Sequence, residues 1–579
     1  MEQLDFNRKL SEMLDRIADM LSVDERGTVR FEVRAYRKAA LSIAELDEDV
    51  RRVYRDGGQS ALMEIPGIGA GISRSIIEYI ERGRMRKYEM LKRRYPIDFE
   101  SLTRIEGLGP KRVVSLYRLL GVKDVAGLRA ALDKHRIRGL KGFGERSEEA
   151  IGRGISMLES ARGRALLGDA LPDAEFIVDK LRASGLAERV EIAGSIRRMQ
   201  ETIGDIDILA ASSRQEEVMD VFSKLDSVES VILRGSTKTS VRLRNGMNCD
   251  LRVIEPDSFG AALQYFTGNK YHNVSVRKIA IKRGYKLNEY GLFNRSGKDM
   301  ARSRDERWIY NRLGMDYIPP EMREDRGEIG LALKHGISDP VELGDLRGDM
   351  HTHTRDSDGM NSIEEMAEAA IRSGLEYFAT TNHTKSLRIA NGMNERGFAE
   401  YFKRVDALND RMNGRIRVIK GAEVDILKDG SLDLSRKSLE SMECVVASVH
   451  SSFNMDERRM TDRIVKAMDS GLVHILGHPT GRLIFKRDGY PIDLDKIGEA
   501  AERDGVAIEI NSFPDRLDLC DTNIMYISKY KIRFAIDSDA HSVKHFSNLR
   551  YGVGTARRGW LTKDRILNCN EIKRLRLGR

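Results

Sequence analysis

The sequence predicts a multidomain chain: an α-helical N-terminal part, an α+β middle part and a C-terminal distorted α/β barrel. A glycine-containing hairpin motif occurs three times between residues 65 and 144. Strands that carry paired acids follow between 190 and 254. From residue 347 onward, short apolar runs that end in His, Asp or Glu alternate with helical stretches. At 579 residues the chain is long enough for several domains, each with its own core.

The composition is that of a globular protein, with 41% apolar and 32% charged residues. A net charge of +8 is compatible with a polyanionic partner. There is no apolar run of membrane-spanning length and no signal peptide, so we expect a cytoplasmic location without membrane association. The four cysteines form no Cys-x-x-Cys pair, which favours a reducing compartment and argues against a thiolate metal site.

Residues 1 to about 55 are expected to be helical. Apolar residues recur there at the spacing of one buried helix face: Leu10, Met13, Leu14, Ile17 and Leu21. The basic amphipathic segment 31–40 is interpreted either as an ordinary solvated helix face or as a surface for a DNA end.

The hairpin motif has the pattern hydrophobic-x-Gly-hydrophobic-Gly, and its copies lie 40 and 35 residues apart. Its glycines are Gly67, Gly69, Gly107, Gly109, Gly142 and Gly144. In a helix-hairpin-helix turn, glycines let the backbone approach a phosphate, and the next helix offers free N–H groups. Lys111 follows the second copy. These contacts would bind the DNA backbone without reading its sequence.

Asp205 and Asp207 lie two apart on a predicted strand, so their carboxylates project to the same face. Such like charges repel unless a cation lies between them, and carboxylate oxygens suit Mg²⁺ or Mn²⁺. An Asp-x-Asp pair alone is more often an ordinary edge strand with solvated acids. The turn at Gly194 and Ser195, followed by Arg198, favours a triphosphate site instead.

Asp250 lies on a second predicted strand, after a turn at Asn245-Gly246. Three carboxylates on neighbouring strands can hold two divalent ions roughly 3.5–4 Å apart, which clamp an in-line phosphoryl transfer.

These motifs, together with Tyr265-Phe266-Thr267-Gly268 and Asn288-Glu289-Tyr290, resemble the palm and thumb of family X DNA polymerases. With the hairpins, the resemblance covers about residues 1 to 318. It implies that Asp205, Asp207 and Asp250 are catalytic and bind two metal ions. The residues that it implies for the incoming nucleotide are Gly194, Ser195, Arg198, Tyr265, Phe266, Gly268 and Asn273.

Among these, Ser195 and Arg198 would hold the triphosphate, and Tyr265 and Phe266 would lie by the sugar and help to exclude ribonucleotides. Asn273 would contact the base or sugar edge, whereas Arg277 would contact the template strand.

Two positions depart from this family. Asn269 stands where members carry Ser, which is a mild change. Ser75 stands where animal repair enzymes place a Schiff-base lysine. A 5′-deoxyribose-phosphate lyase needs an amine there as nucleophile, which argues against that activity. Lys38 or Arg74 nearby would still allow binding of a 5′-phosphate.

Nine of the eleven histidines lie between His335 and His545, which indicates different chemistry in the C-terminal part. Most of its candidate ligands follow short apolar runs: His351, His353, Asp358, His383, Glu423, His450, His478, Asp539 and His541. Repeated strand–helix units predict a parallel barrel, at whose mouth these nine groups would meet. They would hold two or three ions of Mn²⁺, Zn²⁺ or Fe²⁺. A single histidine is more often structural, so His474 and His545 are left out.

This second set resembles the polymerase-and-histidinol-phosphatase (PHP) domain over residues 347 to about 570, with all nine ligand positions filled. Asn382 departs from the aspartate that is common there, beside a ligand. Asn511 and Arg516 are expected to face the phosphate of the substrate. A polymerase core followed by a PHP domain matches the prokaryotic PolX type along essentially the whole chain.

The expected domains are an N-terminal DNA-end-binding domain (1–85), helix-hairpin-helix fingers (86–165), a nucleotidyltransferase palm (166–255), a thumb (256–318), a linker or ordered strap (319–346) and the PHP domain (347–579). The resemblance implies a DNA polymerase that fills short gaps during repair. The PHP site would be a 3′–5′ exonuclease, and abasic-site endonuclease and 3′-phosphatase are further activities that the resemblance allows. Its partners would be gapped or primer–template DNA and deoxynucleoside triphosphates.

Two alternatives stay open. One is a gap-binding scaffold with vestigial metal sites, against which the complete ligand sets argue. The other is a nucleotidyltransferase that acts on a small molecule or RNA, against which the three hairpins and the pair Tyr265-Phe266 argue.

Overall fold

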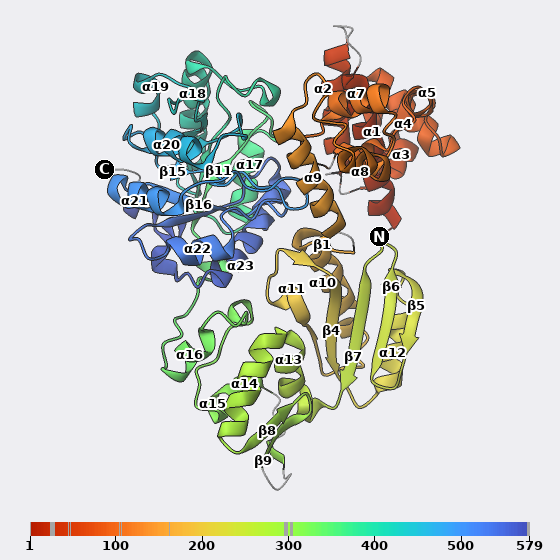
Figure 1. Cartoon of the computed structure of the whole chain (residues 1–579), viewed down its shortest axis with the longest axis vertical. Coiled ribbons are helices and arrows are strands. Elements are labelled where there is room, and N and C mark those ends of the chain that lie inside the picture. The colour runs from red at the N-terminus through yellow and green to blue at the C-terminus, as the bar shows by residue number, and fades with distance from the viewer. Residues whose placement is uncertain are drawn as a thin grey trace. The chain divides into compact units, whose positions relative to one another are not determined.

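The computed structural model describes every residue except 1, 24–28, 45, 47, 104, 106, 161–162, 295–298, 302–304 and 576–579 (Figure 1). The chain forms two compact units, one of residues 1–162 with 485–487 and the other of residues 163–484 with 488–579. Each unit has its own hydrophobic core. Among the described helices, none combines the length and the apolar character that crossing a membrane requires.

The described part of residues 1–162 consists of helices joined by turns, as predicted. The helices are α1 (Glu2–Ser22), α2 (Val29–Ala44), α3 (Val50–Glu64), α4 (Ala70–Arg82), α5 (Arg86–Arg94), α6 (Phe99–Thr103), α7 (Pro110–Leu120), α8 (Val125–Asp133) and α9 (Glu145–Ser160). Leu10, Leu14 and Ile17 on α1 are fully buried, which confirms the predicted apolar face.

The three predicted hairpins are present. Gly67, Gly107 and Gly142 have φ angles of +84°, +77° and +88°, a left-handed backbone that L side chains rarely adopt. Gly69 and Gly109 are the N-cap residues of α4 and α7. The backbone conformation of the turns therefore explains the first glycine of each copy. Glu106, inside the second copy, lies outside the described residues.

The second unit begins with a five-stranded sheet of order β2-β4-β7-β6-β5. Its strands are β2 (Arg189–Ile192), β4 (Asp205–Ala211), β5 (Val228–Arg234), β6 (Lys238–Leu243) and β7 (Asn248–Ile254). Strands β4 and β7 are parallel neighbours, and the other pairs are antiparallel. The sheet is accompanied by α10 (Leu167–Ala183), α11 (Gly194–Arg197), α12 (Gln215–Ser223) and the two-stranded ribbon of β1 (Ala165–Leu166) and β3 (Thr202–Ile203).

A smaller helical and antiparallel region follows. It contains the turn η1 (Pro256–Ser258), α13 (Phe259–Thr267), α14 (Lys270–Lys282), β8 (Tyr285–Asn288), β9 (Gly291–Asn294), β10 (Asp299–Ala301) and α15 (Glu306–Arg312). The segment 319–346, predicted as a linker or strap, forms η2 (Pro320–Met322), α16 (Glu328–Leu333) and η3 (Leu343–Asp345). Met322 and Ala332 are buried in the same core as α14 and α15, so this segment behaves as an ordered strap.

The C-terminal region is a sheet of seven parallel strands in sequence order. The strands are β11 (Gly348–Thr352), β12 (Tyr377–Thr380), β13 (Arg417–Asp425), β14 (Cys444–Ser448), β15 (Ile475–Leu476), β16 (Ala507–Asn511) and β17 (Phe534–Asp537). A parallel bridge between Thr352 and Ala540 brings the last strand back to the first. The sheet is thus a nearly closed barrel, which confirms the predicted distorted α/β fold.

Helices and turns connect the barrel strands. They are α17 (Ile363–Arg372), η4 (Arg388–Ala390), α18 (Glu395–Met412), α19 (Arg436–Glu440), α20 (Glu457–Met468), α21 (Leu494–Asp504), α22 (Asp521–Ile527), η5 (Val543–Asn548) and α23 (Leu549–Arg558), followed by η6 (Lys563–Arg565), η7 (Leu567–Cys569) and η8 (Ile572–Arg574).

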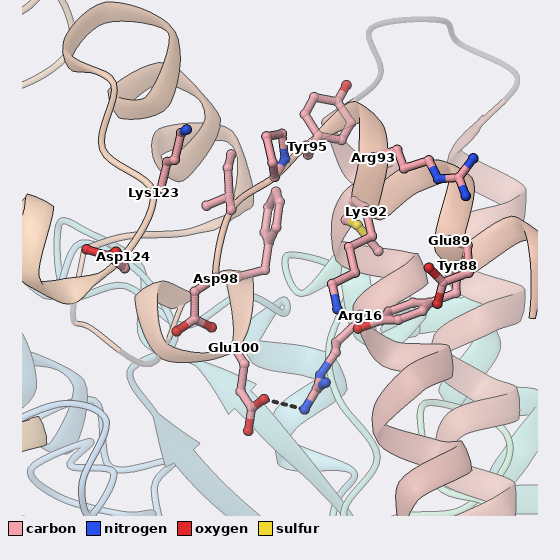
Figure 2. Close-up of a pocket in the computed structure, with 14 residues that line it drawn as sticks. Arg16, Tyr88, Glu89, Lys92, Arg93, Tyr95, Asp98, Glu100, Lys123 and Asp124 are labelled. Carbon is pink, nitrogen blue, oxygen red and sulfur yellow. Dashed lines mark hydrogen bonds and ion pairs between the residues drawn. The ribbon is translucent and has the colours of Figure 1, made fainter. Parts of the chain in front are cut away.

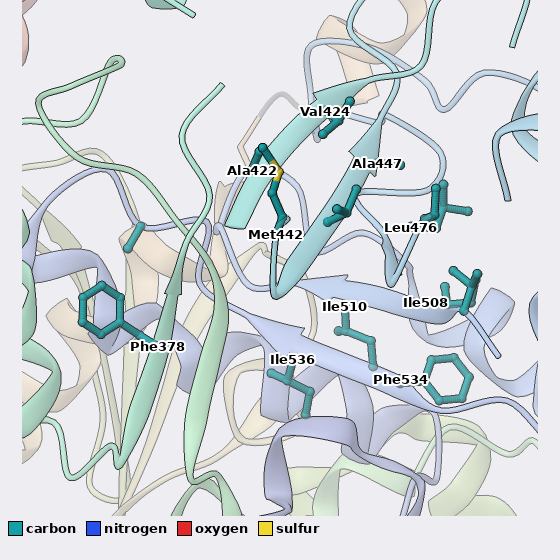
Figure 3. Close-up of a cluster of buried hydrophobic side chains, with 14 of the residues drawn as sticks. Phe378, Ala422, Val424, Met442, Ala447, Leu476, Ile508, Ile510, Phe534 and Ile536 are labelled. Carbon is teal, nitrogen blue, oxygen red and sulfur yellow. The ribbon is translucent and has the colours of Figure 1, made fainter. Parts of the chain in front are cut away.

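Successive residues of each barrel strand point alternately outward, toward the surrounding helices, and inward, into the barrel. Ala422 and Val424 of β13, and Ile508 and Ile510 of β16, belong to a large cluster that includes apolar residues of the surrounding helices (Figure 3). Glu423 lies between the first pair, and so projects to the opposite face of the strand. The apolar pattern of the strands therefore directs the acids between them toward the barrel interior.

Candidate active sites and metal centres

The three predicted acids of the central sheet come together. Asp205 and Asp207 lie on β4, and Asp250 lies on the neighbouring parallel strand β7, directly opposite Asp207. One carboxylate oxygen from each of the three acids lies within 4.8 Å of the other two. The register of two adjacent strands thus produces the predicted triad.

Burial raises the pKa of Asp207 to about 7, and repulsion from Asp205 and Asp250 adds to the effect. Lys238 of β6 makes an ion pair of 2.5 Å with Asp250. Sequence reasoning missed this lysine. A crowded set of carboxylate oxygens fits a hard divalent cation, which would replace repulsion by attraction. The chemistry of the donors therefore suits Mg²⁺ or Mn²⁺.

The turn before this strand is packed directly against the triad. Gly194 has a φ of +60°, and a Cβ atom on it would lie 2.1 Å from Oδ2 of Asp207. The N–H of Ala193 donates to the carbonyl of Asp207 at 2.8 Å. Ser195 is half-buried in the short helix α11, next to this contact. The Gly-Ser turn is thus held beside the acids.

The two arginines of this turn have different surroundings. Arg197 donates to Glu306 at 2.5 Å and to the hydroxyl of Thr267 at 2.6 Å. Arg198 donates through Nε to Glu324 at 2.9 Å and through Nη1 to the carbonyl of Thr267 at 2.5 Å. Both arginines therefore connect the turn to the last residue of α13 and to the segments that follow this helix.

Tyr265 and Phe266 lie at the end of α13 with an edge-to-face contact of 5.1 Å between ring centroids. Asn273 on α14 donates to the carbonyl of Tyr265 at 2.7 Å and accepts from Gln264 at 2.9 Å. Its amide therefore joins α14 to α13. Gly268, with a φ of +70°, ends α13. Arg277 lies on α14 and is half-exposed.

In the first unit, the hairpin glycines leave room for a ligand. A Cβ atom on Gly69, Gly109 or Gly144 would meet nothing within 4 Å. Lys111, in the first turn of α7, is exposed. These surfaces suit the approach of a phosphate backbone. Gly67 differs, because a Cβ atom there would lie 2.7 Å from Cγ of Lys38.

Ser75 lines an open recess of about 480 Å³ on α4. Arg74, Arg82 and Lys87 line the same recess. The hydroxyl of Ser75 donates to the carbonyl of Gly71. Glu78 and Glu81 line the recess too, so both cations and acids lie around the position where related repair enzymes would carry the lysine.

A second recess of the first unit, of about 790 Å³, lies between α1, α5 and α6 (Figure 2). Lys92 and Lys123 line it, but so do Asp98 and Asp124, and Arg16 pairs with Glu100. Its lining is of mixed charge.

The nine predicted ligands of the barrel also come together, at or just after the carboxyl ends of the strands. Most of them line a cavity of about 290 Å³: Asp358, His383, Glu423, His450, His478, Asp539 and His541. His351 and His353, which are fully buried, lie within 4 Å of Glu423 and Asp539.

Three groups of donor atoms, each within 4.8 Å of one another, have the spacing of metal sites. They are His353, Asp358, His383 and His541; His351, His353 and Asp539; and His383, Glu423 and His450. Glu423 is central, because its oxygens lie 2.8 Å from His383 and 2.9 Å from His478. Such a carboxylate suits a bridging position between ions.

Protonation and hydrogen bonding also fit metal binding. Burial, with the nearby His541 and His383, lowers the pKa of His353 to about 3, so its imidazole is neutral as a ligand must be. Neither ring nitrogen of His353, nor Nε2 of His351, has a hydrogen-bond partner among the described residues, although both side chains are buried. Orphaned ring nitrogens of this kind need an ion or water to satisfy them.

Two acids contact the Nδ1 atoms of ligand histidines, and the sequence analysis did not predict either of them. Glu509 of β16 lies 2.6 Å from Nδ1 of His351, and Asp425 lies 3.0 Å from Nδ1 of His450. Carboxylates in this position fix the orientation of ligand imidazoles. An acid inside the apolar run that forms β16 was the signal that could have revealed Glu509.

The other residues expected near this site are in place around it. Arg516 lines the cavity with its Nε 3.6 Å from Asp539. Asn511 donates to the same carboxylate at 3.0 Å. Asn382 is buried and accepts from the backbone N–H of Thr354 at 2.8 Å, so it supports the loop after His353.

Comparison with family models assigns most of these regions. The matches are a helix-hairpin-helix domain (residues 5–85), a SAM-like helix-hairpin-helix tandem (99–153), a DNA polymerase beta thumb (262–324) and a PHP domain (349–513). They cover the three hairpins, the region after the triad and the barrel as far as β16, whereas β17 and the ligands after it lie beyond the PHP match.

Comparison with curated proteins extends to the whole length. The "DNA polymerase/3'-5' exonuclease PolX" of Bacillus subtilis (strain 168) is 36% identical, over 97% of each chain. Two shorter relatives match about 38% of this chain. A "Probable phosphatase" of Thermoanaerobacter sp. (strain X514) is 30% identical over 90% of its length, and one of Tolumonas auensis is 29% identical over 88%. The chain therefore belongs to the PolX family, in which a family X DNA polymerase precedes a PHP domain.

Proposed function

We propose that this protein is a DNA-directed DNA polymerase that fills short gaps during repair and degrades DNA 3′–5′ in its PHP barrel. The observation that supports the proposal is that two separate donor sets have the spacing of metal sites, namely the Asp triad and eight of the nine predicted barrel ligands, with His478 2.9 Å from Glu423. The chain matches, over 97% of its length, a relative that is named a DNA polymerase and 3′–5′ exonuclease. That relative therefore supports one activity for each of the two donor sets. A cytoplasmic location follows from the DNA and deoxynucleotides that it would use.

At the polymerase site, Asp205, Asp207 and Asp250 would hold two Mg²⁺ or Mn²⁺ ions. Bound there, divalent ions lower the pKa of the primer 3′-hydroxyl and neutralise charge on the triphosphate. Asp250 would assist removal of the hydroxyl proton. The oxygen of the primer would then attack the α-phosphate, and pyrophosphate would leave.

The nucleotide would lie between the Gly-Ser turn and α13. The backbone at Gly194, the hydroxyl of Ser195 and the guanidinium of Arg198 would bind the triphosphate. Tyr265 and Phe266 would pack against the sugar, near the turn at Gly268.

On α14, Asn273 would contact the base or sugar edge and Arg277 the template strand. The hairpins would hold the DNA backbone, with Lys111 at the second. The cations of the recess around Ser75, which outnumber the acids Glu78 and Glu81 in its lining, would bind a 5′-phosphate without lyase chemistry.

At the barrel site, the nine ligands would hold two or three ions, which we propose to be Mn²⁺, with Zn²⁺ or Fe²⁺ as alternatives. Such ions supply a nucleophile from water and stabilise the leaving oxygen. Arg516 would hold the phosphate of the terminal nucleotide. A 3′-phosphatase activity is a second candidate, because the shorter relatives that match the barrel are named phosphatases.

The test uses a 5′-labelled primer on a duplex with a one-nucleotide gap, in Mn²⁺, with and without deoxynucleotides. Wild-type protein should lengthen the primer with nucleotides and shorten it without them. Asp205→Ala with Asp207→Ala should abolish lengthening and preserve shortening, and His351→Ala with His353→Ala should do the reverse.

Loss of both activities in either double variant would refute two independent sites. Binding of gapped DNA without any turnover would favour the scaffold, and indifference to DNA would favour a small-molecule transferase.

A further inference from the structure

The carboxylate of Glu324, in the strap after α15, joins two parts of the second unit. Its Oε1 accepts from Nε of Arg198 at 2.9 Å, from Gln200 at 2.6 Å and from Nη1 of Arg558 at 3.0 Å. Its Oε2 accepts from Asn269 at 2.9 Å. Its side chain is only 10% exposed, so these bonds replace water almost completely.

Arg558, at the end of the barrel helix α23, is itself rigidly held. It is 5% exposed, and its Nη2 donates to Asp521 at 2.5 Å. Its Nη1 also donates to the backbone carbonyl of Arg198 at 2.9 Å. Arg558 thus contacts both the main chain of Arg198 and the carboxylate that binds the Arg198 guanidinium.

These contacts hold the guanidinium of Arg198 at two of its three nitrogens. Its Nε and Nη1 are used by Glu324 and by the carbonyl of Thr267, whereas Nη2 makes no hydrogen bond to any described residue. A planar guanidinium held at two nitrogens has a fixed direction for the third. Asn269 and Thr267, at the turn between α13 and α14, are tied into the same network.

Charge gives Arg558 a second effect. Arg198 and Arg558 pair with Glu324, and Arg558 and Arg326 pair with Asp521. Three guanidinium groups thus share two carboxylates, and a net positive charge is left beside the turn. Without Arg558, Glu324 would neutralise Arg198 and compete with an anionic ligand for it. Arg558 of the barrel therefore contributes a positive charge beside Arg198 in addition to holding it in place.

We propose that Arg558 of the PHP barrel is a positioning residue for the polymerase reaction, which acts through Glu324 to set the direction and charge of Arg198 for the incoming triphosphate. This inference rests on the proposed role of Arg198 in binding the nucleotide. It makes the barrel a part of the nucleotide site in addition to a nuclease.

The test measures gap filling by the full-length protein as a function of deoxynucleotide concentration. Arg558→Ala should raise KM for the nucleotide about tenfold, the scale of one lost bond to a charged group, with kcat changed less than about threefold. Arg558→Lys, which restores the charge but not the forked geometry, should recover part of the loss. Arg198→Ala combined with Arg558→Ala should raise KM no further than Arg198→Ala alone.

The neighbouring Arg557 provides the matched control. It donates to Glu321 of the same strap at 2.9 Å and to the carbonyl of Val341, and among the bonds of the described residues it has none to Glu324 or Arg198. Arg557→Ala should leave KM within about twofold of wild type. The inference fails if Arg557→Ala and Arg558→Ala raise KM equally, or if Arg558→Ala lowers only kcat. If Arg198→Ala itself leaves KM unchanged, the proposed role of Arg198 fails first.

Discussion

At the scale of single residues, Gly194 illustrates how an active site fixes a residue type. The atoms of Asp207 occupy the space where a Cβ atom would lie, and the backbone has a positive φ. Both conditions exclude larger residues, the first by overlap and the second by backbone strain. Glycine is therefore required here by the carboxylate that it touches.

We predict that Gly194→Ala lowers gap filling by about 100-fold, the scale expected when reacting groups move by about 1 Å. The added methyl group must displace the carboxylate of Asp207 from the other two acids. The measurement is the single-turnover rate of nucleotide addition. Degradation of DNA by the barrel should stay within about twofold of wild type.

Gly185→Ala is the matched control, because Gly185 has a φ of +66° but open space around its Cβ position. It shares the backbone strain without the overlap. Equal loss of polymerisation in both variants would mean that strain alone, and not displacement of Asp207, is responsible.

At the scale of elements, Glu148 on α9 fixes the segment that leads into the third hairpin. Its carboxylate accepts from the backbone N–H of Ile137 at 3.1 Å and of Arg138 at 2.9 Å, and from Nε of Arg138 at 2.6 Å. Burial raises the pKa of Glu148, but hydrogen bonds from His135 and Arg138 outweigh it and lower the pKa to about 2. The ionised carboxylate thus stabilises this turn.

We predict that Glu148→Gln lowers the local opening free energy of residues 135–148 by about 2 kcal/mol at pH 7, because bonds to a charged group are lost. Since the folded pKa lies below the unfolded value of about 4.3, the stabilisation is complete above pH 4.3 and disappears as the pH falls toward 2. Hydrogen exchange of these residues at pH 7 and at about pH 3 measures it.

Glu145→Gln should have little effect in the same experiment, because the ion pair of Glu145 with Arg138 at 3.2 Å is exposed. A difference between wild type and Glu148→Gln that does not shrink on acidification would contradict the role of the charge.

The same elements show what the sequence can predict. The hairpins were predictable because the first glycine of each copy is required by a positive φ angle, and the barrel ligands because most of them lie in or directly after an apolar strand. Glu324 was not predictable, since its partner Arg198 lies 126 residues away and only packing brings them together. Glu509 left a weak signal, an acid in a buried strand, but its partner His351 belongs to a distant strand.

The segment 319–346 illustrates the same limit. Its two prolines indicated a linker or strap, but nothing local distinguished the two. Burial of Met322 in the core formed with α14 and α15 decides for a strap, and that contact depends on tertiary structure. Local rules thus give the elements and the ligands, whereas the contacts that connect them appear only in the folded chain.

At the scale of the whole molecule, both proposed metal sites lie in the second unit, and the first unit has its own core. Units with separate cores can unfold in separate transitions. The barrel, in addition, carries unsatisfied ring nitrogens on His351 and His353, which cost free energy until an ion or water binds. Metal binding should therefore stabilise one unit selectively.

We predict that calorimetry of the full chain shows two unfolding transitions. Mn²⁺, compared with a chelator, should raise the transition temperature of the second unit only. At a concentration 100 times Kd the gain is about 2.7 kcal/mol for one site, and further sites would add to it. His353→Ala with His541→Ala should remove most of the shift, because both residues belong to the group of four donors. Asp205→Ala with Asp207→Ala should remove only the part of the Mn²⁺-induced shift that comes from the triad, which we expect to be the smaller part. An equal shift of both transitions would contradict selective binding, and the absence of any shift would contradict a metal site in the barrel.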